Sequence, residues 1–139
     1  MTGIYQHSID AKGRLFIPAR LREELGDTFY VTLSMQKCLS IYSLENWERF
    51  EDKVSMMEKS EQTRMRPLFA HAQRCDLDGQ GRILLSKDLR TRGGLLDNNV
   101  AIVGVGRTVE IWDANAWEIE DEKETTPENI EKVLKELHV

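Results

Sequence analysis

The sequence predicts a mainly β domain with α-helices, built from two tandem repeats related by pseudo-symmetry. The stretch 10–22 returns in altered form at 78–90 without a gap, at a separation of 68 residues (78 − 10). Farther along, Ile41 corresponds to Ile111 at a separation of 70 residues (111 − 41), so two residues are inserted between these matches. Because one supersecondary unit is used twice, each half should contain the same order of strands and helices.

Both repeats carry the motif Asp-x-x-Gly-Arg immediately before an apolar strand. The aspartate carboxylate can accept hydrogen bonds from nearby backbone N–H groups, and glycine can adopt a positive φ, so the motif predicts a tight turn. Asp10, Gly13, Asp78 and Gly81 are therefore assigned to turn structure and not to chemistry.

The first repeat, residues 1–59, is expected to alternate strands with helices. Pro18 has the fixed φ that suits the first turn of a helix, and Gly26 ends that helix. Ser43 is a suitable N-cap for a second helix. The expected elements are a strand within 1–9, a strand at 15–17, a helix from 18 to 26, a hairpin of 29–33 and 39–42 with one buried face, and an amphipathic helix from 44 to 57 that covers the hairpin.

Residues 60–74 are expected to form a helical connector between the repeats. Apolar Met65, Leu68 and Phe69 favour a helix, but Pro67 lies among them and removes a backbone donor. The connector should therefore consist of two short helical pieces.

The second repeat, residues 75–118, is expected to follow the order of the first. Ser86 is a good N-cap at the position equivalent to Pro18, and the pair Gly93-Gly94 ends the helix that follows. The remaining elements are a buried strand at 100–105, a turn at Gly106-Arg107, a returning strand at 108–112, and a helix that Asp113 caps and that contains Trp117.

The tail, residues 119–139, is expected to be an acidic linker followed by an amphipathic helix that opens at Thr126-Pro127. Four apolar residues of this helix recur at i, i+3, i+4 and i+7: Ile130, Val133, Leu134 and Leu137. We expect this stripe to pack on its own domain, and a helix that binds a partner is the alternative.

Charge is distributed unevenly along the 139-residue chain. The formal net charge is −5, and residues 118–139 alone hold eight acidic side chains and three lysines, which also leaves −5. The repeated body is therefore neutral, and its two motif regions are locally basic. Binding of a polyanion depends on such a local patch more than on total charge, so nucleic acid remains a candidate partner. Exposed arginines that pair with neighbouring acids are the alternative interpretation.

Other classes of protein have little support in the sequence. Cys38 and Cys75 lack the spacing of a zinc site or a disulfide framework, and the longest apolar run, 100–105, is too short to cross a membrane. The start of the chain lacks a leader pattern, so we expect a cytoplasmic protein with no membrane partner.

An enzyme is also disfavoured. His7, His71 and His138 lack metal-ligand spacing, and no Ser or Cys lies in a nucleophile motif. The glycines near 80 and 105 are too few for a dinucleotide fingerprint, and the acidic stretch 76–79 lacks the later ligands of a calcium loop. We therefore expect no catalytic residue, no metal, no cofactor and no small-molecule substrate.

The paired motifs resemble those of the MraZ family of bacterial transcriptional regulators. The resemblance spans nearly the whole chain and includes the opening 3–14, the following stretch 17–22, the second motif at 75–84 and the tryptophan-containing helices. It implies a double-split, swapped-hairpin β-barrel of the kind seen in AbrB-like regulators and some antitoxins, with both hairpins supplied by one chain.

The same resemblance implies a function. Family members form ring-shaped homo-oligomers and bind short G-rich direct repeats in double-stranded DNA upstream of the division and cell-wall gene cluster, which usually begins with their own gene. The expected role is therefore a nucleoid-associated regulator of its own operon, most simply a repressor.

Recognition of G-rich DNA requires hydrogen-bond donors at the edge of the major groove. An arginine fork bonds guanine O6 and N7 together, and lysine reaches the same acceptors. Arg14 is therefore expected to contact bases and Lys12 to contact bases or phosphates, with Arg82 and Gln80 as their counterparts. The alternative is that each motif arginine pairs with its own turn aspartate, an interpretation favoured less in the first repeat than in the second. Further basic residues are expected to contact phosphates and set position: Arg20, Arg22, Lys87 and Arg90.

A single subunit with two small arms would bind DNA weakly, so repeated sites favour several subunits that bind several repeats at once. The apolar strands and the last helix are the candidate contacts of a ring. The alternative function is an antitoxin-like or scaffold module that binds another protein. A toxin gene next to this gene would favour the module, and a division gene cluster would favour the regulator.

Overall fold

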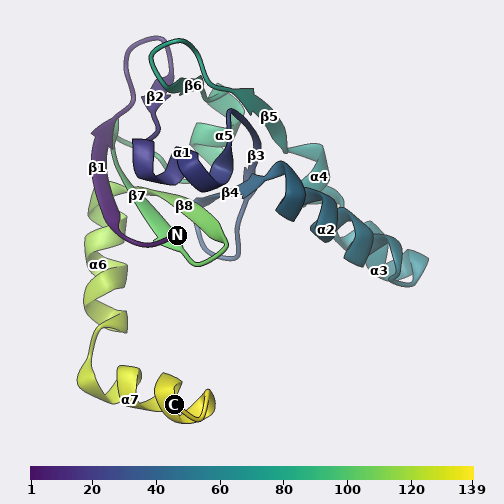
Figure 1. The fold of residues 1–139 in the computed structure, drawn as a ribbon, viewed down its shortest axis with the longest axis vertical. Helices are drawn as coiled ribbons and strands as arrows, with labels where there is room; N and C mark the ends of the chain where they lie inside the picture. The colour runs from purple at the N-terminus through teal and green to yellow at the C-terminus, as the bar shows by residue number, and fades with distance from the viewer.

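The computed structural model describes residues 1–139, in which eight β-strands and seven α-helices follow one another (Figure 1). The first repeat contributes β1 (Ile4–Ser8), β2 (Arg14–Phe16), α1 (Ala19–Leu25), β3 (Thr28–Leu33), β4 (Leu39–Ser43) and α2 (Leu44–Ser55). The connector holds α3 (Lys59–Arg64) and α4 (Arg66–Ala70). The second repeat and the tail contribute β5 (Gln73–Asp76), β6 (Arg82–Leu84), α5 (Lys87–Arg92), β7 (Asn99–Val105), β8 (Thr108–Asp113), α6 (Ala114–Glu124) and α7 (Pro127–Glu136).

Helix starts follow the local signals of the sequence. The Ser43 hydroxyl accepts the N–H of Asn46, and Ser86 and Asp113 accept equivalent bonds at the starts of α5 and α6. Pro67 lies in the first turn of α4, so the connector is two helical pieces, as predicted. None of the seven helices has the length and apolar character needed to cross a membrane.

The sheet topology interleaves the two repeats. Six antiparallel strands lie in the order β1-β7-β8-β4-β3-β5, and β2 pairs with β6 in a separate two-stranded sheet, called the ribbon below. The first strand of each repeat pairs with the third strand of the other, β1 with β7 and β5 with β3. The two repeats also meet at the centre of the sheet, where β4 pairs with β8. The antiparallel sheet therefore depends on both halves of the chain.

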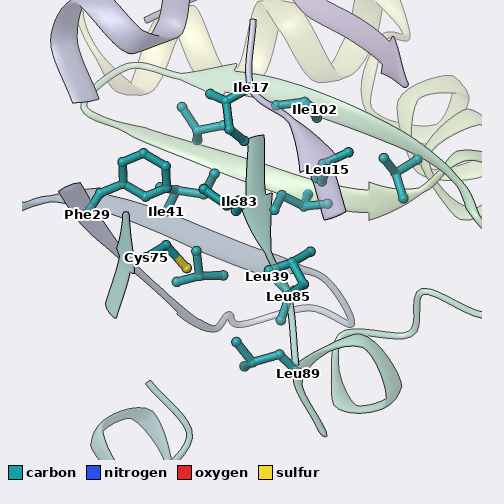
Figure 2. Close-up of a cluster of buried hydrophobic side chains, with 14 of the residues drawn as sticks. Leu15, Ile17, Phe29, Leu39, Ile41, Cys75, Ile83, Leu85, Leu89 and Ile102 are labelled. Atoms are coloured by element: carbon teal, nitrogen blue, oxygen red, sulfur yellow. The ribbon is translucent and has the colours of Figure 1, made fainter. Parts of the chain in front are cut away.

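The main hydrophobic core lies between the six-stranded sheet and a layer formed by the ribbon with α1 and α5 (Figure 2). Leu15 and Ile83, directly opposite each other in the ribbon, are 0% and 1% exposed. Leu21 of α1 and Leu89 of α5 are each 1% exposed in the same cluster. Because side chains alternate along a strand, burial of Leu15 and Ile83 turns their neighbours on the ribbon outward.

The second face of the sheet is also covered. Trp47 of α2 stacks on Tyr30 of β3 with ring centroids 4.7 Å apart, and Phe69 of α4 packs edge-on against Trp47 at 5.6 Å. Thr32 is only 1% exposed, and its hydroxyl donates to the Leu68 carbonyl of α4. The predicted cover of the hairpin by α2 is confirmed, and α4 of the connector adds to it, which strand periodicity does not reveal.

The tail differs from its prediction in two respects. The acidic residues 119–124, expected as a linker, are the second half of α6. The stripe of α7 does not pack on its own domain, since Ile130, Val133 and Leu134 are 48%, 45% and 45% exposed. Helix α7 projects away from the sheet (Figure 1). The joint itself is ordered, because Thr126 caps α7 and the Asn129 amide donates to the Glu124 carbonyl.

Candidate nucleic-acid interface

The first motif folds as a closed turn around the carboxylate of Asp10. Oδ1 accepts the backbone N–H groups of Lys12 and Arg14, each at 2.9 Å, and Oδ2 accepts Arg14 Nε at 2.7 Å. Two backbone bonds close the loop, from Asp10 N to the Arg14 carbonyl and from Gly13 N to the Asp10 carbonyl. Gly13 has φ +84°, a conformation that favours glycine. The turn roles assigned to Asp10 and Gly13 are therefore present.

The second motif repeats this geometry. The Asp78 carboxylate accepts the N–H groups of Gln80 and Arg82, and Arg82 Nε, each at 2.9 Å. Gly81 has φ +77°, as the motif predicted. The alternative role of the motif arginines, pairing with their own aspartates, is thus found in both repeats and not in the second alone.

These hydrogen bonds favour the charged carboxylates. Backbone donation from Arg14, together with the bonds from its side chain and from Lys12, lowers the pKa of Asp10, although partial desolvation opposes the shift. Backbone donation from Arg82 is likewise the main cause of the lowered pKa of Asp78. Each turn therefore holds an ionised aspartate that orients an arginine.

The pairing leaves part of each guanidinium free. Asp10 and Asp78 bind only Nε, so the two terminal nitrogens of Arg14 and Arg82 have no partner within the chain. The two side chains are 33% and 27% exposed. Terminal guanidinium nitrogens are the ones that form the fork that recognises guanine or phosphate. Structural pairing and DNA contact are thus compatible in one residue.

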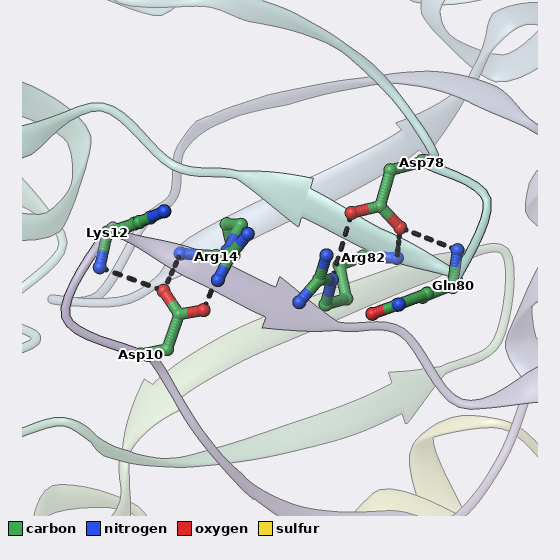
Figure 3. A network of polar contacts seen from close by, with 6 residues as sticks. All are labelled: Asp10, Lys12, Arg14, Asp78, Gln80 and Arg82. Atoms are coloured by element: carbon green, nitrogen blue, oxygen red, sulfur yellow. Dashed lines mark hydrogen bonds and ion pairs between the residues drawn. The ribbon is translucent and has the colours of Figure 1, made fainter.

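The ribbon brings the two motifs together. Arg14 lies opposite Leu84 and Phe16 lies opposite Arg82, in antiparallel register. Figure 3 shows the arginine side chains next to each other at the middle of the ribbon, with Lys12 and Gln80 on the turns at its two ends. Lys12 and Gln80 are exposed, and neither side chain makes a hydrogen bond within the chain. Four predicted contact residues therefore lie along one short element.

The four other predicted contact residues lie on α1 and α5, and they differ in how exposed they are. Arg20 and Lys87 are exposed at the first turns of their helices. Arg22 and Arg90 lie two and three residues farther along, where they are half-buried against the motif turns. The structure thus places all four in the layer that contains the ribbon.

Two residues of the outward face were missed by sequence reasoning. Phe16 and Leu84 alternate with buried Leu15 and Ile83, so they share the face of Arg14 and Arg82, and Leu84 is 57% exposed. The signal was available in the sequence, because a strand that buries Leu15 must present both of its neighbours on the other face. The outward face therefore combines cationic with apolar groups.

The cysteines take no part in this face. Cys75 lies in the main core and Cys38 in a second cluster beneath α6. Burial raises the pKa of each thiol to about 12. Both are neutral core residues at ordinary pH.

Comparison with known proteins identifies the family. The family model described as "MraZ protein, putative antitoxin-like" matches residues 1–66 and 68–135. The chain belongs to the MraZ family. The two matched stretches follow each other along the chain, in keeping with the two repeats.

Curated members of the MraZ family resemble the chain over most of its length. A protein named transcriptional regulator MraZ from Alkaliphilus metalliredigens is 37% identical over 99% of this chain and 98% of its own length. The protein of the same name from Acetivibrio thermocellus is 44% identical over 84% of this chain and 82% of its own length. The one from Thermoanaerobacter pseudethanolicus is 38% identical over 100% of this chain and 99% of its own length. These names designate regulators, which is not an enzymatic role. Among solved structures, the solution structure of PHS018 from Pyrococcus horikoshii aligns with 78% of this chain and 84% of that one at 15% identity and a TM-score of 0.31.

Proposed function

We propose that this MraZ-family chain is a sequence-specific DNA-binding transcriptional regulator that inserts the ribbon into the major groove. The groove is wide enough for a two-stranded β-ribbon. The observation that carries the proposal is the pair of aspartate-held arginines, Arg14 and Arg82, whose terminal nitrogens are free and which lie side by side on the ribbon. Orientation by a neighbouring carboxylate reduces the rotamer freedom that each arginine loses on binding.

The proposed target is a set of short G-rich direct repeats in the promoter of the protein's own operon, the division and cell-wall gene cluster. Arg14, Arg82 and Lys12 suit guanine, because O6 and N7 are both acceptors. Binding there would repress transcription and place the protein on the nucleoid. The replacement of Lys12 by Gln80 in the second repeat gives the two halves unequal affinity.

We propose that the fold is a double-split, swapped-hairpin β-barrel. The exchange of β1 and β5 between the repeats supports this, as does the pairing of β2 with β6 across them. In this arrangement one chain supplies both halves of one DNA-binding unit.

We also propose that the protein acts as a ring-shaped homo-oligomer. One ribbon touches few base pairs, so several subunits on several repeats would provide the affinity that one lacks. The uncovered stripe of α7 supports this assembly, because an apolar helix face of this kind is normally buried by a neighbour. A second copy of the chain is the proposed neighbour.

The test is a gel-shift titration of the full chain with DNA from upstream of its own gene, at two salt concentrations, against scrambled DNA. Phosphate contacts make all binding salt-dependent, so a preference that survives at the higher salt indicates base recognition. Arg14→Ala is expected to weaken specific binding by about tenfold or more, with a smaller loss for Arg82→Ala, since one bidentate contact contributes roughly 1–3 kcal/mol of discrimination.

The matched control is Arg49→Ala. Arg49 lies on α2 and pairs with Glu45 at 2.8 Å, outside the ribbon layer. The Arg49→Ala variant should bind the upstream DNA as tightly as the parent protein does. Parent-like binding by Arg14→Ala, with unchanged circular dichroism and elution volume, would show that the assigned contact is wrong.

The second candidate is an antitoxin-like or scaffold module that binds another protein. The exposed stripe of α7 favours it, because such a helix could occupy a groove on a partner. An assembled oligomer that prefers neither DNA in the titration would make this the better assignment.

A further inference from the structure

Arg22 and Arg90 are equivalent in the two repeats, and both lack an acceptor. Each Nε is buried without a hydrogen-bond partner. Arg92, the other arginine of α5, differs, because its Nε binds the Asp88 carboxylate at 2.7 Å. The terminal nitrogens of both guanidinium groups also lack a partner but are not buried, so each site keeps donors that an arriving anion can reach.

Each of these arginines lies on the turn of the opposite repeat. A Cβ placed on Gly81 would come within 2.5 Å of Arg22 Nη1 and 2.9 Å of its Cζ. A Cβ placed on Gly13 would come within 3.4 Å of Arg90 Nη2 and 3.5 Å of its Cζ. The guanidinium of Arg22 therefore covers the second turn, and that of Arg90 covers the first.

The antiparallel ribbon explains this crossing. The end of β2, from which α1 starts, lies beside the turn that precedes β6, and the reverse holds for β6 and the first turn. Backbone bonds fix both junctions, from Ile17 N to the Gly81 carbonyl and from Leu85 N to the Gly13 carbonyl, each at 2.9 Å. From the sequence alone, Arg22 would have been expected to lie near the first motif, Asp10 to Arg14, which precedes it in the same repeat.

The groups at each turn suit an oxyanion. The first turn combines Arg90 with exposed Lys12, and the turn aspartate is already bound to Arg14. The second turn combines Arg22 with the neutral Gln80. Arg22 is further held by the Phe16 ring, 5.3 Å from its Cζ.

We propose that each motif turn and the arginine of the opposite repeat form one composite site for a DNA backbone phosphate. The first site consists of the Gly13 turn, Lys12 and Arg90, and the second of the Gly81 turn and Arg22. The inference rests on the proposed function, since its ligand is the DNA that the ribbon reads. Two such sites, one at each end of the ribbon, fix the position of the ribbon along the groove. Each site requires both repeats.

The test is a double-mutant cycle measured by fluorescence anisotropy, with the full chain and labelled DNA from upstream of its own gene. Lys12→Ala is combined with Arg90→Ala and, separately, with Arg22→Ala. The free-energy changes of two substitutions are coupled when the residues are neighbours and additive when the residues are far apart. The cycle with Arg90 is expected to deviate from additivity by about threefold or more in the dissociation constant, and the cycle with Arg22 is expected to be additive.

Salt dependence supplies a measurement that a purely structural role would not change. Arg90→Ala should lower the slope of log K against log salt by about one, whereas Arg90→Lys should keep it. Arg92→Ala, a control on the same helix, should retain the parent slope. Melting temperatures identify variants whose loss comes from unfolding.

Two results would overturn the inference while leaving the proposed function in place: coupling of Lys12 to Arg22 instead of Arg90, or an unchanged slope in Arg90→Ala. A parent protein that does not distinguish its own upstream DNA from scrambled DNA would overturn the proposed function, and the composite sites with it.

Discussion

At the scale of single residues, one carboxylate performs two tasks in each motif. Asp10 binds two backbone N–H groups, which closes the turn, and it also binds Arg14 Nε, which sets the direction of the guanidinium. The first task could be predicted from the sequence, because it involves only the next four residues. The second was an open alternative, since an arginine on an exposed turn could equally have extended into solvent.

A glycine substitution tests the turn at this scale. Gly13→Ala is expected to lower the free energy of unfolding by about 1–2 kcal/mol, because an L-residue is strained at positive φ. The added methyl would also lie 3.1 Å from the Leu85 carbonyl oxygen. Urea denaturation measures the change.

Gly79→Ala is the matched control, since Gly79 lies in the equivalent turn of the second repeat with φ outside the left-handed region and nothing within 4 Å of an added Cβ. The Gly79→Ala substitution should change the free energy of unfolding by no more than about 0.5 kcal/mol. Equal losses of unfolding free energy in Gly13→Ala and Gly79→Ala would show that strain at positive φ is not the cause.

At the scale of elements, the order of strands and helices followed from local signals, and α2, α5 and α6 begin at their predicted N-caps. The extent of α6 did not, because the acidic stretch 119–124 contains no helix breaker and simply continues the helix. The connector helices were predicted as well, although the role of α4 as a cover for β3 was not. Which face an element buries depends on neighbours that local periodicity does not include.

The two motif turns predict a pH dependence of stability. Hydrogen bonds lower the pKa of Asp10 and Asp78 from the ordinary value of 3.8, so the folded state holds these protons less tightly than the unfolded state. Their stabilising contribution is complete above that ordinary value and is lost as pH falls through the lower folded-state pKa.

Denaturant titrations from about pH 5 to about pH 2 should therefore show a decline in the free energy of unfolding. The double variant Asp10→Asn and Asp78→Asn should show a shallower decline over the same range, because neither amide titrates. Parallel pH profiles for variant and parent would assign the acid sensitivity to other carboxyl groups.

At the scale of the whole molecule, the two proposed contact surfaces are separated in space. The basic ribbon lies at one end of the molecule, and α7 projects from the opposite end (Figure 1). The net charge of −5 in residues 118–139 is thereby kept away from the proposed DNA contact. This separation explains how an acidic protein can present a local basic face to a polyanion.

Substitution on α7 tests the proposed assembly. Leu134 is 45% exposed, so Leu134→Glu should leave the melting temperature of the dissociated subunit unchanged while it removes an apolar contact between subunits. Light scattering after size exclusion should show smaller species, and affinity for repeated sites should fall by roughly 10²-fold or more as multivalency is lost.

Lys132→Glu changes an exposed residue of the same helix outside the apolar stripe and serves as the control for added charge. The Lys132→Glu variant should form an oligomer of the same mass as the parent protein. An unchanged mass for Leu134→Glu as well would exclude α7 as the contact between subunits.

The sequence by itself determined the duplication, the two aspartate turns, the order of elements and the residue types that could contact DNA. These features depend on hydrogen bonds and periodicities within a few residues, which can be read locally. Only the tertiary structure decided that β2 pairs with β6, that Arg14 and Arg82 lie side by side, and that Arg22 and Arg90 cover the opposite turns. It also decided that α7 stays uncovered. Such contacts join residues roughly 70 positions apart, and their choice depends on the complementary shape of the packed core, which no local pattern contains.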